Sequence, residues 1–218
     1  MFRVRSIQVE HGDSLLVSYG MDEQLYHLLV DGGPSGSLQI VKSVLKSECV
    51  GGRIRLEALV VTHYDLDHIK GVIELLEDMP DWLDIGEVWF NGHHHLIPSD
   101  ILGPREGDTL TELIRSHGLS WNASFRNQQN GYNDAAIVQS SNAASLRGGL
   151  EVRVLSPDQD GLTALARHWT DPAIPPSDSE SAPRDLLGRN ETWPPKRFSL
   201  NGGVTFVSDT SVPNRSSI

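Results

Sequence analysis

Four side chains that can bind metal ions lie between positions 63 and 68 of the 218-residue chain, and they are His63, Asp65, Asp67 and His68. His63 and Asp65 are two residues apart, so in an extended loop they can point the same way. Asp67 and His68 turn toward a second point as a helix begins. This spacing suits two neighbouring metal ions.

Two such ions, about 3.5 to 4 Å apart, lower the pKa of a shared water and clamp the oxygens of an in-line displacement. The carboxylate of Asp65, in place of an imidazole, makes the first site harder and shifts its preference from zinc toward manganese, magnesium or iron. We therefore expect two divalent ions, Zn or Mn, as cofactors, or one ion where the ligand set is incomplete.

A simpler interpretation of the same residues is a solvated turn. Asp67 would cap the helix and His68 would be its first residue. Against this, unpaired carboxylates and imidazoles rarely crowd the end of a buried strand unless a cation neutralises them.

The surrounding pattern predicts the elements that must position these side chains. Residues 56–61 are rich in β-branched side chains without polar alternation, which favours a strand buried on both faces. Residues 69–76 follow a helical period that ends before Pro80. The cluster therefore follows the end of a strand, where ligands gather in layered α/β structures.

Shorter patterns complete the expected α/β fold. Residues 2–9, 14–18 and 25–30 predict a meander of three strands, and residues 38–45 predict a helix. Further on, we expect one strand over 85–90 and a helix over 109–117 capped by Asp108. A Pro-rich polar stretch at 171–196 predicts a surface loop or disordered insertion within a single domain, 1–218.

Three motifs, in order, resemble the metallo-β-lactamase fold superfamily. Segment 62–71 is similar to its HxHxDH signature followed by Gly, and the HxDxDH form with Asp65 resembles the branch that includes the metallohydrolase domain of competence-type (ComEC-like) DNA-uptake proteins. Segment 9–17, with its Gly-Asp-Ser turn, is similar to the opening strand of that branch, and segment 29–33 to its second motif.

The resemblance implies a metallo-β-lactamase-like αββα sandwich and a role for each ligand. His63 and Asp65 would bind one metal, and Asp67 and His68 the other. Asp67 would also orient the attacking water as the catalytic residue. Asp31 would either support the ligand loop from behind or act as a plain turn residue.

The resemblance also implies further ligands that the chain lacks. A stretch similar to 213–218 leads, in the family, to a Gly-Asp whose carboxylate bridges the metals and later to another His. We therefore expect the fold to be incomplete at its C-terminal side, holding the first half to two-thirds. Asp209 is a candidate to approach the metals, and His93, His94 and His95 are candidates for the pocket.

Charge and composition narrow the function. The chain has 18 Lys and Arg against 29 Asp and Glu, a net charge of −11, which argues against coating long nucleic acid by charge. Cys49 is the only cysteine, which excludes an internal disulfide and a cysteine-based zinc knuckle. No apolar run approaches the length of a membrane span, so we expect a cytoplasmic protein without membrane contact.

These observations predict a metal-dependent hydrolase with a metal-bound hydroxide as nucleophile. The expected substrate is a phosphodiester, which makes the protein a nuclease or a nucleotide phosphodiesterase, and a thioester or lactam would use the same metals. The alternative is a catalytically silent binding or regulatory module of the same fold. That module would need a protein partner, or a missing C-terminal segment, to complete it.

Overall fold

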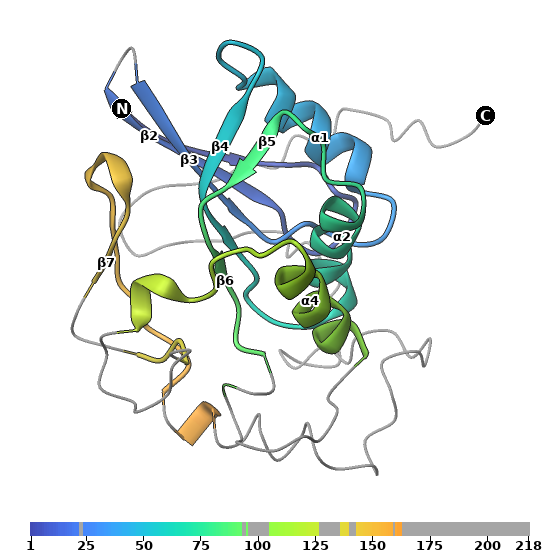
Figure 1. Cartoon of the computed structure of the whole chain (residues 1–218), viewed down its shortest axis with the longest axis vertical. Coiled ribbons are helices and arrows are strands. Elements are labelled where there is room, and N and C mark those ends of the chain that lie inside the picture. Colours follow the sequence, from blue (N-terminus) through green and yellow to red (C-terminus); the bar gives the residue numbers. More distant parts are fainter. Residues whose placement is uncertain are drawn as a thin grey trace, which may run out of the picture. The chain divides into compact units, whose positions relative to one another are not determined.

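The structure is a computed structural model that describes residues 1–21, 24–92, 95, 105–126, 136–139, 143–158 and 160–162 (Figure 1). All of them belong to one compact unit, Met1–Ser179. The predicted loop at 171–196 lies outside the described residues. Among the described helices, none combines the length and the apolar character needed to cross a membrane.

A mixed six-stranded sheet forms the centre of this unit. Its strands are β1 (Phe2–Ser6), β2 (Leu15–Met21), β3 (Gln24–Val30), β4 (Ile54–Val60), β5 (Leu83–Ile85) and β6 (Val88–Trp89). The first three strands form an antiparallel meander, as predicted, and β3 pairs with β4 in parallel. The order is β1-β2-β3-β4-β5, and β6 also pairs with β4.

The predicted single strand over 85–90 is wrong, because the chain there forms two short strands on the same neighbour. β5 pairs with the start of β4 and β6 with its end. Between them, the backbone N–H of Gly86 donates to the Leu56 carbonyl at 2.8 Å, and a Cβ on Gly86 would lie only 2.7 Å from the Glu57 carbonyl oxygen. The chain bends at Gly86, and β5 and β6 keep the same register against β4.

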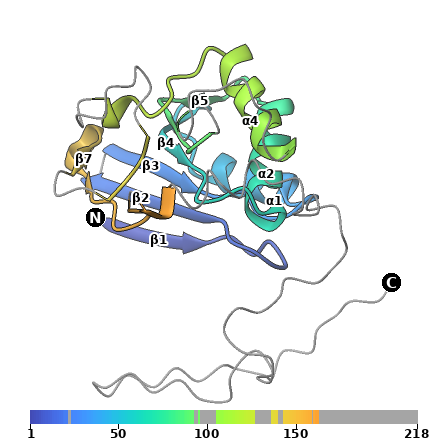
Figure 2. The ribbon, with the colours of Figure 1, turned by 90° about the horizontal axis from the view of Figure 1, so that it is seen from below.

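Three helices, α1 (Leu38–Ser47), α2 (Leu66–Glu77) and α4 (Arg105–Ser116), lie on one side of the sheet (Figure 2). The helix after 105 begins earlier than predicted, so Asp108 lies in its first turn and does not precede it. An acidic side chain in this position is still favourable, because the N-terminus of a helix carries partial positive charge.

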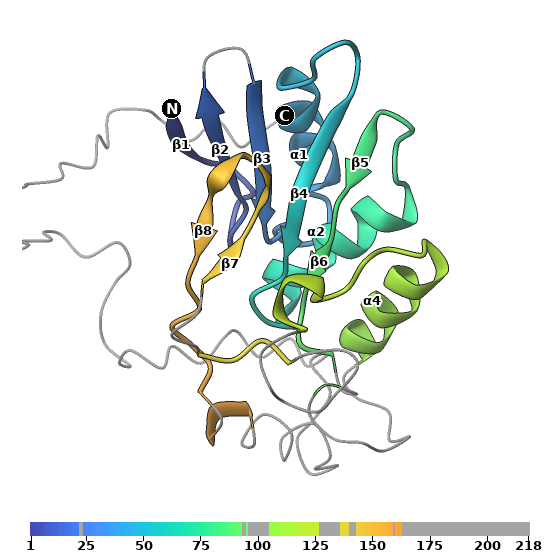
Figure 3. The ribbon, with the colours of Figure 1, turned by 60° about the vertical axis from the view of Figure 1, so that its left-hand side comes forward.

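The other side of the sheet carries a short hairpin, β7 (Ala144–Ser145) and β8 (Glu151–Val152), as Figure 3 shows. Successive residues of a strand therefore point into two different cores. Leu16 of β2 and Leu29 of β3 pack with the helices, whereas their neighbours Val17 and Leu28 pack on the hairpin side. Burial of both faces explains why residues 28–30 of β3 and 58–60 of β4 are apolar without alternation. The fold is thus mixed α/β, with helices, sheet and hairpin in successive layers.

Candidate metal centre

The turn after β3 and the first turns of α2 touch through their backbones. The N–H of Gly32 donates to the His68 carbonyl at 2.9 Å, and the N–H of Gly71 donates to the Gly33 carbonyl at 2.9 Å. A Cβ on Gly71 would lie 1.9 Å from the Gly32 carbonyl oxygen. Only glycines allow this approach, which brings the end of β3 against the segment that follows β4.

The turn before β2 joins the same contact. The N–H of Gly33 donates to the Asp13 carbonyl at 3.0 Å. Gly12 has a φ of +69°, and a Cβ there would lie 1.9 Å from the Asp67 carbonyl oxygen. The three motifs that are separate in the sequence therefore meet in space around the start of α2.

Asp31 lies at the centre of the polar contacts, with only 1% of its surface exposed. Its Oδ1 accepts the backbone N–H of Thr62 at 2.8 Å, and its Oδ2 accepts the Thr62 hydroxyl at 2.6 Å and the Nδ1–H of His68 at 3.0 Å. Its backbone adopts the left-handed region, at a φ of +56°, which aspartate tolerates better than most residues. Asp31 thus connects the end of β3 to both ends of the ligand loop.

The same contacts orient the two imidazoles. An ionised Asp31 can only accept, so the single hydroxyl proton of Thr62 goes to its carboxylate. The Thr62 oxygen, 2.7 Å from His63 Nδ1, must then accept that N–H. His63 and His68 therefore both donate from Nδ1 and keep Nε2 as the free ligand atom, the arrangement in which histidines usually bind metals.

Each Nε2 atom faces a carboxylate. His63 Nε2 lies 3.6 Å from Asp65 Oδ2, and His68 Nε2 lies 3.7 Å from Asp67 Oδ2. The two imidazole rings are themselves neighbours, with centroids 3.8 Å apart. Among the described residues, the group whose ligand atoms all lie within 4.8 Å of one another is Asp31, His63 and His68. Asp65 and Asp67 are each brought beside one of these imidazoles but do not belong to that group.

These separations fit a bound cation better than a hydrogen bond. Both exceed the usual N–H···O distance of about 2.7 to 3.2 Å. Two ligands of one tetrahedral ion lie about 3.4 Å apart when each metal–ligand bond is about 2.1 Å long. The pairs His63 with Asp65 and Asp67 with His68 are therefore spaced like ligands that share an ion.

The helix does not use these carboxylates for capping. The residue that caps α2 is Asp65, and its side chain makes no capping hydrogen bond. Asp67 lies inside the first turn, so the interpretation in which it caps the helix and His68 opens it is wrong. The exposed fractions of the Asp65 and Asp67 side chains, 64% and 36%, leave both free to reach a ligand.

A cavity of about 470 Å³ borders His63 on the hairpin side of the sheet. Tyr64 also borders it, and burial, followed by the negative charge of Asp65, raises the pKa of its phenol. Thr62, which connects His63 to Asp31, was not predicted as a residue of the site. The sequence signal that could have identified Thr62 is its position, as a hydroxyl residue between the end of a buried strand and a histidine.

Of the other predicted pocket residues, the structure describes only His95. His95 is buried, accepts the Gly92 N–H at Nδ1 over 3.1 Å and lies edge-on to Trp121 at a centroid distance of 4.8 Å. It packs in the interior and does not line the cavity beside His63. His93, His94 and Asp209 lie outside the described residues.

Comparison of the chain with protein-family models, curated proteins and solved structures finds no match. The chemistry of this centre is therefore inferred from its own side chains. From here on, "metal centre" is short for this candidate site, His63, Asp65, Asp67 and His68 with Asp31 behind them.

Proposed function

We propose that the protein is a metal-dependent hydrolase of the metallo-β-lactamase fold superfamily that cleaves a phosphodiester. One observation carries the proposal: the two imidazole Nε2 atoms, oriented by Asp31 and Thr62, each face a carboxylate at 3.6 to 3.7 Å. The layering of helices, mixed sheet and hairpin supports an αββα sandwich whose second sheet is represented, among the described residues, only by β7 and β8.

The proposed metal sites follow these contacts. His63 and Asp65 would hold one ion, and Asp67 and His68 the other. Divalent ions bound there supply a nucleophile at neutral pH and stabilise the charge that develops on the ester oxygens. Asp31 keeps both imidazoles in the tautomer that can bind, because it accepts from His68 directly and from His63 through the Thr62 hydroxyl.

Asp67 is the candidate catalytic residue. Its carboxylate is partly exposed beside His68 Nε2, and no hydrogen bond to the helix occupies it in the described structure. It can therefore accept a proton from an attacking water while it holds that water in line, which is the work of a general base. A partly exposed carboxylate suits this role better than the fully buried Asp31.

Charge favours a small phosphodiester over long nucleic acid. The chain carries a net charge of −11, and the centre contributes three carboxylates of its own. A polyanion would be repelled along its whole length, whereas bound cations can offset the repulsion at one phosphate. A nucleotide or another small phosphodiester needs only that local attraction.

The metal content of the purified protein tests the centre. We expect Asp67→Asn combined with His68→Ala to abolish metal uptake without unfolding the chain, since neither side chain fills a core. His117→Ala is the matched control: that imidazole contacts the Leu76 carbonyl at 2.8 Å, away from the centre. Metal retained by the double variant at the wild-type stoichiometry would refute the site.

Turnover is a separate test. Hydrolysis of bis-p-nitrophenyl phosphate with added manganese, lost in Asp67→Asn, supports the hydrolase. If the metal-loaded protein cleaves none of bis-p-nitrophenyl phosphate, single-stranded DNA and RNA, the result would instead support the silent binding module.

A further inference from the structure

The cavity beside His63 is large and its walls are mainly apolar. Val30, Val60 and Trp89 of the sheet form one side, and Ile137 and Val154 face them. Ligand pockets usually measure about 300 to 1,000 Å³, whereas packed interiors contain few voids larger than a water molecule. A cavity of about 470 Å³ therefore has the size of a binding pocket.

The cavity is held open by specific contacts. The side-chain amide of Asn91, at the end of β6, donates to the Ile137 carbonyl at 2.8 Å and accepts the Ile137 N–H at 2.7 Å. This pair of hydrogen bonds fixes the segment 136–139 across from the sheet. The Asn91 amide is thus already paired, and the other polar residues of the lining are Thr62, His63 and Tyr64 beside the metal centre and Arg153 and Ser156 on the segment 152–157.

Trp89 adds an unsatisfied donor to this wall. Its side chain is buried, with 3% of the residue exposed, and its Nε1–H has no acceptor among the described residues. A buried donor without a partner is costly and rare in folded proteins. The Nε1 atom has almost no solvent-exposed surface, so this donor is not within reach of a group bound in the cavity.

We propose that this cavity binds an apolar, aryl-sized substituent of the substrate, with the scissile ester at the His63 end. The position of the ester rests on the proposed function, whereas the affinity of the cavity for apolar groups does not. The substrate class is then a small phosphodiester in which at least one of the two ester groups is apolar and about the size of an aryl ring. A sugar–phosphate chain would lose hydrogen bonds to water in this cavity, and its apolar walls offer no hydrogen bonds in exchange.

Binding of 8-anilinonaphthalene-1-sulfonate to the metal-free protein tests the cavity alone. We expect saturable binding of one equivalent of the probe per protein, and the fluorescence of the probe measures this binding. Val154→Phe fills the cavity and should weaken binding at least tenfold. Val4→Phe, on β1 where Val4 is 53% exposed, is the matched control and should leave binding unchanged.

Equal affinity of the wild type and Val154→Phe, or no saturable binding, would overturn the proposal. Thermal melting checks that each variant is folded. Ile137→Phe, which narrows the cavity from a different segment, replaces Val154→Phe if the latter does not fold.

A kinetic comparison separates the two proposals. The cavity is proposed to hold the substituent that stays on phosphorus, which is aryl in bis-p-nitrophenyl phosphate and methyl in methyl p-nitrophenyl phosphate. We therefore expect Val154→Phe to lower kcat/KM for bis-p-nitrophenyl phosphate at least tenfold while changing that for methyl p-nitrophenyl phosphate less than twofold. If the wild type binds the probe but hydrolyses neither ester, the proposed function fails and the cavity's affinity for apolar groups stands. If both esters lose activity equally in the variant, the cavity does not bind the substituent.

Discussion

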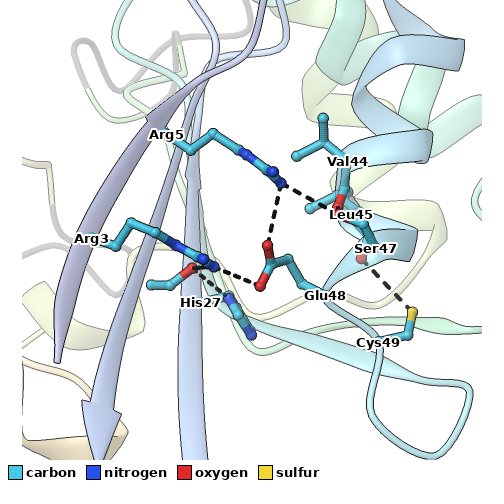
Figure 4. A network of polar contacts seen from close by, with 9 residues as sticks. Arg3, Arg5, His27, Val44, Leu45, Ser47, Glu48 and Cys49 are labelled. Carbon is cyan, nitrogen blue, oxygen red and sulfur yellow. Dashed lines mark hydrogen bonds and ion pairs between the residues drawn. The ribbon is translucent and has the colours of Figure 1, made fainter.

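The metal centre and a second polar cluster are built from the same kinds of groups but differ in what balances their charge. The second is the arginine cluster of Arg3, Arg5, Ser18, His27 and Glu48, in which the Ser18 hydroxyl contacts Arg3 and His27. Both guanidinium groups of this cluster reach one carboxylate (Figure 4). The Arg3 Nη2 to Glu48 Oε2 distance is 2.6 Å, and the Arg5 Nη1 to Glu48 Oε1 distance is 3.2 Å. That carboxylate needs no further cation.

The carboxylates of the metal centre have no such partner. Within the described parts of the chain, Asp31, Asp65 and Asp67 form ion pairs with histidines only. Three acidic groups around two imidazoles leave an excess of negative charge that a bound cation can offset. A histidine beside a carboxylate thus indicates a metal site only where no arginine or lysine side chain pairs with that carboxylate.

The two regions also differ in how they are held together, which predicts the largest effect. Gly71→Ala should lower the free energy of unfolding by at least about 3 kcal/mol, since the new Cβ meets backbone that cannot yield. Gly36→Ala, whose Cβ would meet nothing within 4 Å at a φ of +87°, is the control and should cost only about 1 kcal/mol, from its positive φ. Urea denaturation measures both, and equal losses would contradict the close backbone contact.

Neutralising one carboxylate in each region tests the comparison directly. Asp31→Asn should weaken Zn²⁺ or Mn²⁺ binding by about 10- to 100-fold, because an amide has a single acceptor oxygen and cannot accept all three hydrogen bonds that Thr62 and His68 donate to Asp31. Glu48→Gln should leave metal affinity unchanged. Calorimetric titration measures both, and a similar loss in Glu48→Gln would remove the distinction between the regions.

His27 predicts a pH effect confined to the arginine cluster. Burial, the largest influence, lowers the pKa of His27 in the folded protein below its usual 6.5. The unfolded chain therefore binds a proton more readily than the folded one, and stability falls as the pH drops below about 6.5. His27→Gln should reduce the difference between urea midpoints at pH 7.5 and 5.5 and leave metal uptake intact. An unchanged difference would show that His27 does not titrate on unfolding.

The smallest effect is expected for Arg5→Ala. The Arg5 side chain is largely solvated, and Arg3 still pairs with Glu48 in its absence, so the loss should be below about 1 kcal/mol. Adding salt should reduce it further. A larger loss in urea denaturation would mean that Arg5 contributes packing as well as charge.

Local sequence patterns predicted most of the elements around the centre. The alternation in β1 to β3, the continuous apolar run of β4 and the helical period of α2 each depend on neighbours in the sequence, and the structure confirms all of them. The starts of α2 and α4 and the break between β5 and β6 were not predicted. Those boundaries depend on tertiary neighbours such as the Leu56 carbonyl that accepts from Gly86.

The types of ligand and their spacing from 63 to 68 were determined by the sequence alone, because strand, loop and helix follow one another there. Only the tertiary structure decided that Asp31, 37 positions before His68, accepts its Nδ1–H. The tertiary structure also decided that the Thr62 hydroxyl donates to Asp31 and accepts from His63. The physical reason is the backbone contact between Gly32 and Gly71, which exists only once β3 and α2 have packed together and which no local pattern encodes.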